Sequence, residues 1–127
     1  MPTISPVQTA EVQGAIARAA TRTGVDFDYL LAQARLESGL DPSAKARTSS
    51  ATGLYQFIDS TWLRTLDRHG AKHGMDWADA AIAPNGRVAD AATRDQLLSL
   101  RYDADASSLM AAELTPETAV GLRTTLG

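Results

Sequence analysis

The sequence of 127 residues contains no cysteine. This absence excludes disulfide bonds, zinc sites built on thiolates and catalysis by a thiol. An excess of positive charge is also lacking, since the formal net charge is −3. We therefore do not expect nucleic acid or an acidic membrane surface as the partner, because both require a basic face. A neutral polymer such as a glycan is compatible with this charge.

Long apolar segments are absent as well. No run approaches the roughly 20 residues that a membrane-spanning helix needs. The first residues, Met-Pro-Thr-Ile-Ser-Pro, have neither the basic start nor the apolar stretch of a secretory signal peptide. The hydrophobic share of 44% and the charged share of 21% are those of an ordinary globular protein. We expect a single domain over residues 1–127, with no membrane span.

Alternating β-branched residues and hairpin signals are scarce, whereas alanine is abundant, so the sequence predicts an all-α domain. A first helix is expected over residues 6–23, ended by Gly24, and a second from Asp26 as the N-cap to Ser38–Gly39. A polar loop follows over residues 41–52. Further helices are expected at about 59–70, 77–82, 90–102, 104–114 and 116–126, with a turn at 84–86. The prediction is about six to seven helices around one core.

Glu37 is the first candidate for chemistry. It lies in the last turn of an otherwise apolar helix, on the face that carries Leu30 and Ala34. Burial on that face and the negative end of the helix dipole would both disfavour the charged carboxylate. A carboxyl group kept protonated near neutral pH is what a glycosidase uses as its general acid. A glutamate that faces solvent at a frayed helix end is the simpler interpretation of the position alone.

Two motifs around Glu37 change that balance. The first runs Glu37-Ser38-Gly39-Leu40-Asp41-Pro42-Ser43-Ala44, and the second is Gly53-Leu54-Tyr55-Gln56-Phe57, followed by Thr61-Trp62. Their order and their separation of about sixteen residues resemble the signature of soluble lytic transglycosylases, in the lysozyme-like superfamily. The resemblance implies a lysozyme-like all-α fold and cleavage of the β-1,4 bond between N-acetylmuramic acid and N-acetylglucosamine in peptidoglycan.

The resemblance also implies a role for each matched residue. Glu37 would be the catalytic acid/base, and Ser38 would bond near the reacting sugar or hold the glutamate. Backbone at Gly53 would approach the glycan, where a side chain would obstruct it. Gln56 would donate to the substrate or position Glu37, and Tyr55 would stack on a sugar face or pack as a core aromatic. The expected substrate-binding residues are Ser38, Gly53, Leu54, Tyr55, Gln56, Phe57 and Tyr102.

The motifs supply one acid only. Hydrolysis with retention or inversion uses a second carboxylate, but Asp41 and Asp59 are more simply a turn residue and a helix cap. The resemblance implies instead that the acetamido group of the substrate assists departure and that its 6-hydroxyl closes a 1,6-anhydro ring. Glu37 would then act first as acid and later as base, without metal or cofactor. A hydrolytic muramidase, or a non-catalytic glycan-binding domain of a flagellar or secretion assembly, are the alternatives.

Many relatives carry a later Ala-Tyr-Asn-x-Gly motif that this sequence lacks. The stretch from Arg101-Tyr102-Asp103 to Ser108-Leu109-Met110 resembles a proteobacterial branch in which the chain continues to a further aromatic motif. Tyr102 is the candidate to replace the missing tyrosine, and the domain would be shortened at its C-terminus. The resemblance further implies a monomer in the periplasm or outside the cell, acting on peptidoglycan strands, with flagellar or secretion-system proteins as candidate partners.

Three other sets have two interpretations each. His69 and His73, four residues apart, could be metal ligands, although a solvated helix end is simpler. Trp62 and Trp77 could line a sugar groove, although core packing is the default. Three basic residues could meet carboxylates of peptidoglycan or form exposed salt bridges: Lys45, Arg47 and Arg64.

Overall fold

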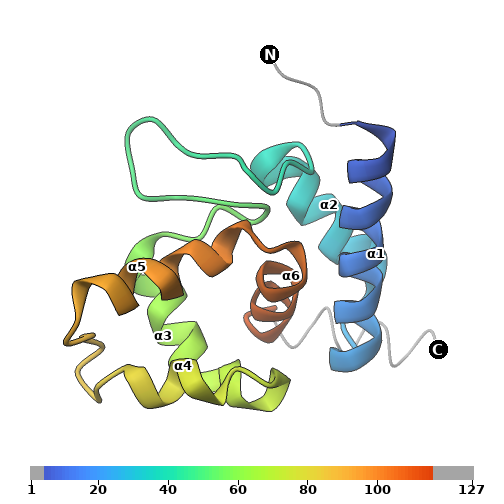
Figure 1. Ribbon diagram of the computed structural model, residues 1–127. Coiled ribbons are helices and arrows are strands. Elements are labelled where there is room, and N and C mark those ends of the chain that lie inside the picture. Colours follow the sequence, from blue (N-terminus) through green and yellow to red (C-terminus); the bar gives the residue numbers. More distant parts are fainter. Residues whose placement is uncertain (1–4, 116–127) are drawn as a thin grey trace.

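The computed structural model describes residues 5–115, and within them the regular elements are all helices (Figure 1). The α-helices are α1 (Pro6–Thr23), α2 (Phe27–Ser38), α3 (Asp59–His69), α4 (Asp76–Ala81), α5 (Ala91–Ser99) and α6 (Ala104–Glu113). Two 3₁₀ helices accompany them, η1 (Gly70–His73) and η2 (Leu100–Tyr102). The all-α prediction is confirmed. In this part of the chain no helix has the length and apolar character that crossing a membrane requires.

The ends of the first two helices follow from local chemistry. Ser5 caps α1, which ends at Gly24 with a φ of 79°. The Asp26 side chain accepts a hydrogen bond from the backbone N–H of Tyr29 at 2.9 Å, and α2 ends at Gly39 with a φ of 66°. A positive φ is readily available to glycine, so both helices stop where the sequence predicts.

The later helices within the described residues also lie where they were predicted, but one predicted helix is divided into two elements. The helix expected over 90–102 is α5 followed by η2, because Asp103 begins a new helix by accepting from the backbone N–H of Ala106 at 3.0 Å. The helix expected over 116–126 lies outside the described residues. Between α2 and α3 the predicted polar loop makes a long excursion away from the helices (Figure 1).

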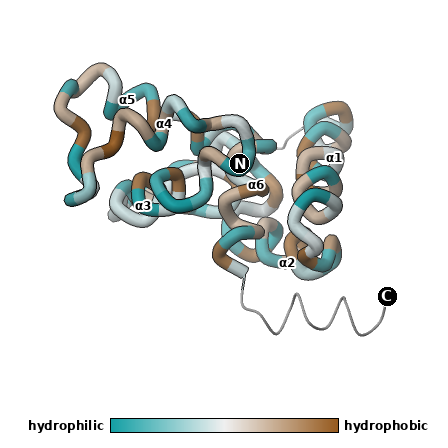
Figure 2. The backbone as a smooth tube through the Cα atoms, turned by 90° about the horizontal axis from the view of Figure 1, so that it is seen from below, coloured by the Kyte–Doolittle hydropathy of each residue, from teal (hydrophilic) through white to brown (hydrophobic). Residues whose placement is uncertain are grey.

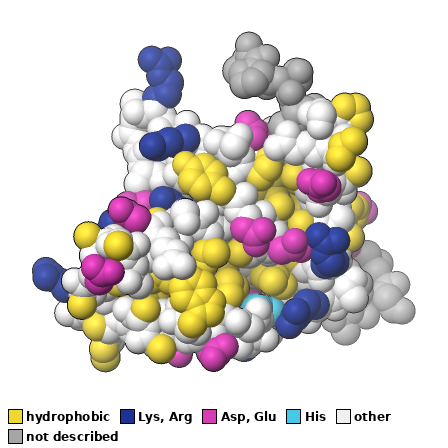
Figure 3. All heavy atoms as spheres, in the orientation of Figure 1, with side chains coloured by type: hydrophobic (Ala, Val, Ile, Leu, Met, Phe, Trp, Pro, Cys, Tyr) yellow, Lys and Arg dark blue, Asp and Glu magenta, His cyan; other side chains and the backbone are white. Residues whose placement is uncertain are grey.

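The core surrounds α6, which lies between α1 and α3 in both ribbon and tube views (Figures 1 and 2). Side chains fill the spaces between these helices, and apolar groups gather on the face shown in Figure 3. Trp62 is fully buried, as the default interpretation predicts, and its Nε1 donates to the Leu97 carbonyl at 2.8 Å. Trp77 departs from that default, since 44% of it is exposed. The largest buried residues of five helices meet here: Ile16, Leu30, Trp62, Leu97 and Met110.

The C-terminal end of α6 is held against η1 by Glu113. Nε2 of His73 lies 2.7 Å from Glu113 Oε2, Nζ of Lys72 lies 3.3 Å from Oε1, and Nδ1 of His69 lies 3.6 Å from Oε1. The His73 side chain is only 6% exposed, so the solvated helix end expected from the sequence was wrong for it. The carboxylate arrives from a helix distant in sequence, which spacing alone could not reveal. Among residues 5–115, no cluster of histidine and acidic side chains could hold a metal ion.

The surroundings of this cluster lower the pKa of both His69 and Glu113. Burial lowers the pKa of His69, and nearby Lys72 lowers it further. Burial alone would raise the pKa of Glu113, but hydrogen bonds from His73 and Lys72 outweigh it, so the net shift is downward. The folded protein therefore favours a neutral His69 and a charged Glu113. The unfolded chain binds each proton more readily, so acidification favours unfolding at both groups.

We expect the stability of the protein to fall as the pH drops, first below the ordinary histidine value of 6.5 and again below the ordinary glutamate value of 4.5. Glu113→Gln should cost about 2 kcal/mol at pH 7 and remove most of the decline below pH 4.5. Urea unfolding at several pH values measures both effects. Lys72→Met should cost less than Glu113→Gln, because the Lys72 side chain is 56% exposed and its ion pair with Glu113 is screened by solvent. Equal losses in the two variants would contradict the assignment.

Candidate active site

Glu37 lies in the last turn of α2, whose buried face is made by Leu30 and Ala34. Contrary to the sequence-based expectation, Glu37 itself is exposed. The apolar stripe of α2 ends at Ala34 and the chain leaves the helix at Gly39, so Glu37 lies beyond the buried part of the helix. Within residues 5–115 the side chain of Glu37 takes part in no hydrogen bond or ion pair. The carboxylate is thus available to a ligand.

A pocket of about 130 Å³ opens beside Glu37. Its walls come from three places that are far apart in sequence: α2, the loop that precedes α3, and the end of α6. The other lining residues are Gln33, Tyr55, Phe57, Ala111 and Leu114. Glu37 is the only acidic residue among them. A small, partly apolar hollow with one carboxylate has the character of a ligand site.

Ser38 joins the two motifs that the sequence singles out. Its Oγ donates to the Leu54 carbonyl at 2.7 Å and accepts from the backbone N–H of Asp41 at 3.2 Å. The end of α2 that carries Glu37 is therefore fastened to the Gly-Leu-Tyr-Gln turn. The separation of the motifs has a physical reason, since Ser38 reaches the carbonyl sixteen residues later. Holding the segment that bears the glutamate is one of the two roles expected for Ser38.

The side chain of Gln56 holds its own turn by hydrogen bonds to backbone carbonyls. Its Nε2 donates to the Gly53 carbonyl at 2.9 Å and to the Ala44 carbonyl at 3.1 Å, while Gly53 N–H donates to Ala44 at 2.7 Å. Gln56 also has a φ of 55°, which is uncommon for a residue other than glycine. Its amide group is engaged by the loop and forms no bond to Glu37. Gln56 shapes the wall of the pocket through the backbone.

The aromatic residues of the second motif form a fixed wall. Tyr55 is 8% exposed, and its hydroxyl donates to the Leu30 carbonyl of α2 at 2.8 Å. Burial raises the pKa of Tyr55, so it stays a neutral donor. Phe57 packs edge-on against Trp62 with ring centroids 4.9 Å apart. Leu54 is fully buried. The broad face expected for sugar stacking at Tyr55 is therefore mostly covered, although the residue lines the pocket.

Gly53 is required for a reason that the sequence did not reveal. It has a φ of 87°, and a Cβ at this position would lie 2.1 Å from the Arg101 carbonyl oxygen. The sequence analysis expected a glycan close to Gly53, but the backbone carbonyl of Arg101 occupies that place. Gly53 is buried, so this contact belongs to the interior of the fold.

Arg101 holds the loop that lines the pocket. Nothing in the sequence identified it as a site residue. Its Nη1 donates to the carbonyls of Ser50 at 2.8 Å and Phe57 at 2.9 Å, and lies 2.8 Å from Asp59 Oδ1. The residue is only 7% exposed. Its carbonyl partners precede it by 51 and 44 residues, so no local pattern could identify it. The arginine fixes both arms of the loop that presents Phe57 to the pocket.

The two aspartates considered as second acids lie elsewhere. Asp41 Oδ1 accepts from the backbone N–H of Ser43 at 2.9 Å, which confirms the turn residue predicted. Asp59 is not the expected helix cap, because Ile58 occupies that position and Asp59 pairs with Arg101. Neither lines the pocket of Glu37. The structure thus provides no second carboxylate at the pocket walls that it describes.

Tyr102 is not brought to Glu37 either. It is 45% exposed and lines a different hollow of about 340 Å³, together with Pro42 and residues of α1. The turn between η2 and α6 directs it to that side. A role beside the glutamate, which the sequence suggested for Tyr102, has no support in this arrangement.

One comparison with known proteins bears on this site. The family model described as the transglycosylase SLT domain matches residues 14–92, which is more than half of the chain. The matched span includes Glu37, Ser38 and the whole Gly53–Gln56 turn. It ends before Arg101 and α6, although the structure uses both to complete the pocket.

Proposed function

This chain belongs to the transglycosylase SLT domain family, and we propose that it cleaves the β-1,4 bond between N-acetylmuramic acid and N-acetylglucosamine with formation of a 1,6-anhydro-N-acetylmuramic acid end. The family supports a glycan-cleaving enzyme whose substrate is peptidoglycan. The observation that carries the finer proposal is the pocket beside α2, where Glu37 is the one acidic residue among the described residues that line it.

The proposed reaction needs one carboxyl group in two states. Glu37 in its protonated form gives a proton to the glycosidic oxygen as the bond to C1 breaks, while the substrate's acetamido oxygen bonds to C1. The Glu37 carboxylate then takes the proton of the 6-hydroxyl, whose oxygen attacks C1 and displaces the acetamido oxygen. Glu37 ends protonated, as it began. The second carboxylate of hydrolytic glycosidases is not required.

The exposure of Glu37 fits this reaction when the substrate is considered part of the site. Tyr55, Phe57 and Leu114 contribute apolar groups to the pocket walls. A glycan strand lying over them would displace water from the carboxylate and disfavour its charged form. The protonated acid that the first step requires would therefore be favoured by substrate binding.

Product analysis tests the proposal. We expect digestion of purified peptidoglycan to release fragments with anhydro ends, which mass spectrometry distinguishes from reducing ends by the mass of one water. Reducing ends would instead identify a hydrolytic muramidase. Retained binding without release of fragments would identify a non-catalytic glycan-binding domain. Either of these results would overturn the proposed reaction.

Because peptidoglycan lies outside the cytoplasm, we propose that the protein acts in the periplasm or after secretion, and as a monomer. Flagellar or secretion-system partners rest on the resemblance of the sequence alone.

A further inference from the structure

The last turn of α6 has two sides with different partners. Ala111 and Leu114, three residues apart on one side of the helix, line the pocket of Glu37. Glu113 lies between them in sequence, but its carboxylate meets η1 instead. This short stretch of helix therefore joins the pocket wall to η1, none of whose residues lines the pocket.

Glu113 stands where α6 alone would disfavour it. A negative charge in the last turn adds to the negative end of the helix dipole, and α6 has no basic residue in that turn to offset it. The side chain is also only 17% exposed, and covering a charge costs free energy unless it is paired. The compensation comes from outside α6, from the end of α3 and from η1.

We call Glu113 together with His69, Lys72 and His73 the clamp. Both carboxylate oxygens of Glu113 take part in it. Oε2 lies 2.7 Å from Nε2 of His73, whereas Oε1 faces Nζ of Lys72 at 3.3 Å and Nδ1 of His69 at 3.6 Å. Because the two oxygens are held separately, the clamp fixes the orientation of the carboxylate as well as its position.

His73 makes the shortest contact of the clamp, and its side chain is 6% exposed. Its Nδ1 is buried and has no hydrogen-bond partner within residues 5–115. A proton on Nδ1 would be an unsatisfied buried donor, so the tautomer that fits carries its proton on Nε2. In that form Nε2–H donates to the charged carboxylate of Glu113, which is a stronger hydrogen bond than one between neutral groups.

The clamp ties α6 to a well-fixed part of the fold. Across η1, the backbone N–H of Met75 donates to the Gly70 carbonyl at 2.9 Å. Gly70 is buried, and a Cβ there would lie 3.3 Å from the Met75 carbonyl oxygen. Element η1 thus packs closely on the end of α3, whose Trp62 is fully buried in the core. The pocket wall made by α6 is held from α3, and not from the helix that bears Glu37.

We propose that Glu113 is a positioning residue of the Glu37 pocket. Through His73 it holds the last turn of α6, and this turn sets where Leu114 lies beside the Glu37 carboxyl group. Without the clamp the turn frays, and the apolar wall that helps to displace water from Glu37 is lost. The consequence for cleavage rests on the proposed function, whereas the consequence for the helix end does not.

Hydrogen exchange of backbone amides, followed by NMR, tests the clamp without any substrate. The Leu114 amide donates to the Met110 carbonyl at 3.2 Å, and the Thr115 amide donates to the Ala112 carbonyl at 3.1 Å. In Glu113→Gln we expect both amides to exchange about tenfold faster or more, because the last turn opens locally.

Two substitutions of His73 test its part in the clamp. His73→Leu should speed the exchange of the same amides, since leucine has no donor. His73→Gln keeps an N–H near the place of Nε2 and should restore much of the protection.

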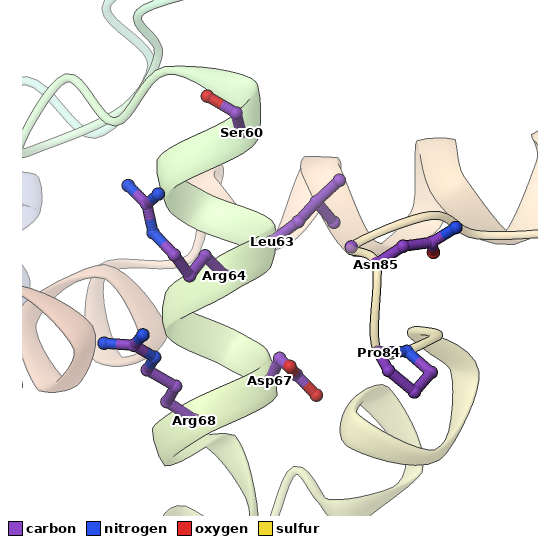
Figure 4. A pocket seen from close by; sticks show the side chains of 8 residues that line it. Ser60, Leu63, Arg64, Asp67, Arg68, Pro84 and Asn85 are labelled. Atoms are coloured by element: carbon purple, nitrogen blue, oxygen red, sulfur yellow. The ribbon is translucent and has the colours of Figure 1, made fainter.

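Two controls separate the clamp from a general loss of stability. Asp67→Asn makes the same carboxylate-to-amide change near the end of α3, but Figure 4 shows Asp67 pointing into the hollow beside the Pro84–Asn85 turn, which no residue of α6 lines. Ile82→Ala leaves a cavity in the core and should lower the midpoint of thermal unfolding by roughly 8 °C. Neither control should speed exchange at Leu114 more than at amides of the core helices.

Cleavage tests the consequence for the site. We expect kcat/KM for the release of anhydro fragments to fall about tenfold in Glu113→Gln, at a temperature at which every variant is folded. Ile82→Ala should stay within about twofold of the unchanged protein, because its cavity lies away from the pocket. The double variant Glu113→Gln/His73→Leu should lose no more than the worse single variant, since both changes break one contact.

Each outcome decides one part of the inference. Exchange at Leu114 that is no faster in Glu113→Gln than in Ile82→Ala would overturn the clamp. Faster exchange with unchanged kcat/KM, or single losses that multiply in the double variant, would overturn the positioning role. If the unchanged protein released no anhydro fragments, the proposed function would fail, while the exchange rates would still show whether the clamp holds the pocket wall.

Discussion

Glu37→Gln is expected to lower kcat for peptidoglycan cleavage by at least about 10³-fold. Glutamine preserves the shape of the side chain but neither gives nor takes the proton in the two proposed steps. Among residues 5–115 no second acid lines the pocket to replace it, so the loss should be as large at high substrate concentration as at low. The release of anhydro fragments, measured against time at saturating peptidoglycan, gives this number.

The same substitution should leave the fold unchanged. Glu37 is exposed and has no hydrogen bond or ion pair among residues 5–115, so its midpoint of thermal unfolding should match that of the unchanged protein. Glu11→Gln, an identical chemical change on the exposed side of α1, is the matched control and should retain full activity. Activity of Glu37→Gln within a few-fold of the control would show that another group is the acid.

Gly53→Ala is expected to destabilise the protein by about 3 kcal/mol. A left-handed backbone, with a φ of 87°, already disfavours alanine. The new Cβ would also lie 2.1 Å from the Arg101 carbonyl oxygen, so the turn and η2 must move apart. Thermal unfolding followed by circular dichroism should show a midpoint lower by roughly 10 °C. Cleavage should fall as well, because Ser38 and Phe57 are both anchored to this turn or to Arg101.

Gly74→Ala separates the cost of the left-handed backbone from the cost of the close contact with Arg101. Gly74 has nearly the same φ, 83°, but no atom lies within 4 Å of its added Cβ. It should therefore cost only about 1–2 kcal/mol, the penalty of the left-handed conformation. The difference between the two variants measures the contact with Arg101. If both variants lost the same free energy of unfolding, the contact between position 53 and Arg101 would contribute nothing to the loss in Gly53→Ala.

Features that depend on neighbouring residues were predicted from the sequence. Asp26 as a cap and Gly24 and Gly39 as stops act within one turn of the helix, so residue type and spacing suffice. The burial of Trp62 follows from the apolar stripe of α3. The candidate site was found through two contiguous motifs, and the hydrogen bond between Ser38 and Leu54 gives their separation a physical basis.

Features that depend on distant partners were not predicted. The sequence around Arg101 contains nothing that points to the carbonyls of Ser50 and Phe57. His73 meets Glu113 from another helix, so its burial could not be inferred from its own segment. The exposure of Glu37 was missed for a related reason. Helix periodicity predicts which face points inward, but not how far neighbouring elements extend to cover its end.

The position of Arg101 also has a consequence for the order in which the molecule is made. The glutamate and both motifs are synthesised before the arginine that fixes the loop, which follows Phe57 by 44 residues. At 5–20 residues per second, this interval is roughly 2 to 9 s. During it a nascent chain carries the acid and the turn without the cation that joins them. The helix bearing Glu37 thus leaves the ribosome before the residues that complete the wall of its pocket.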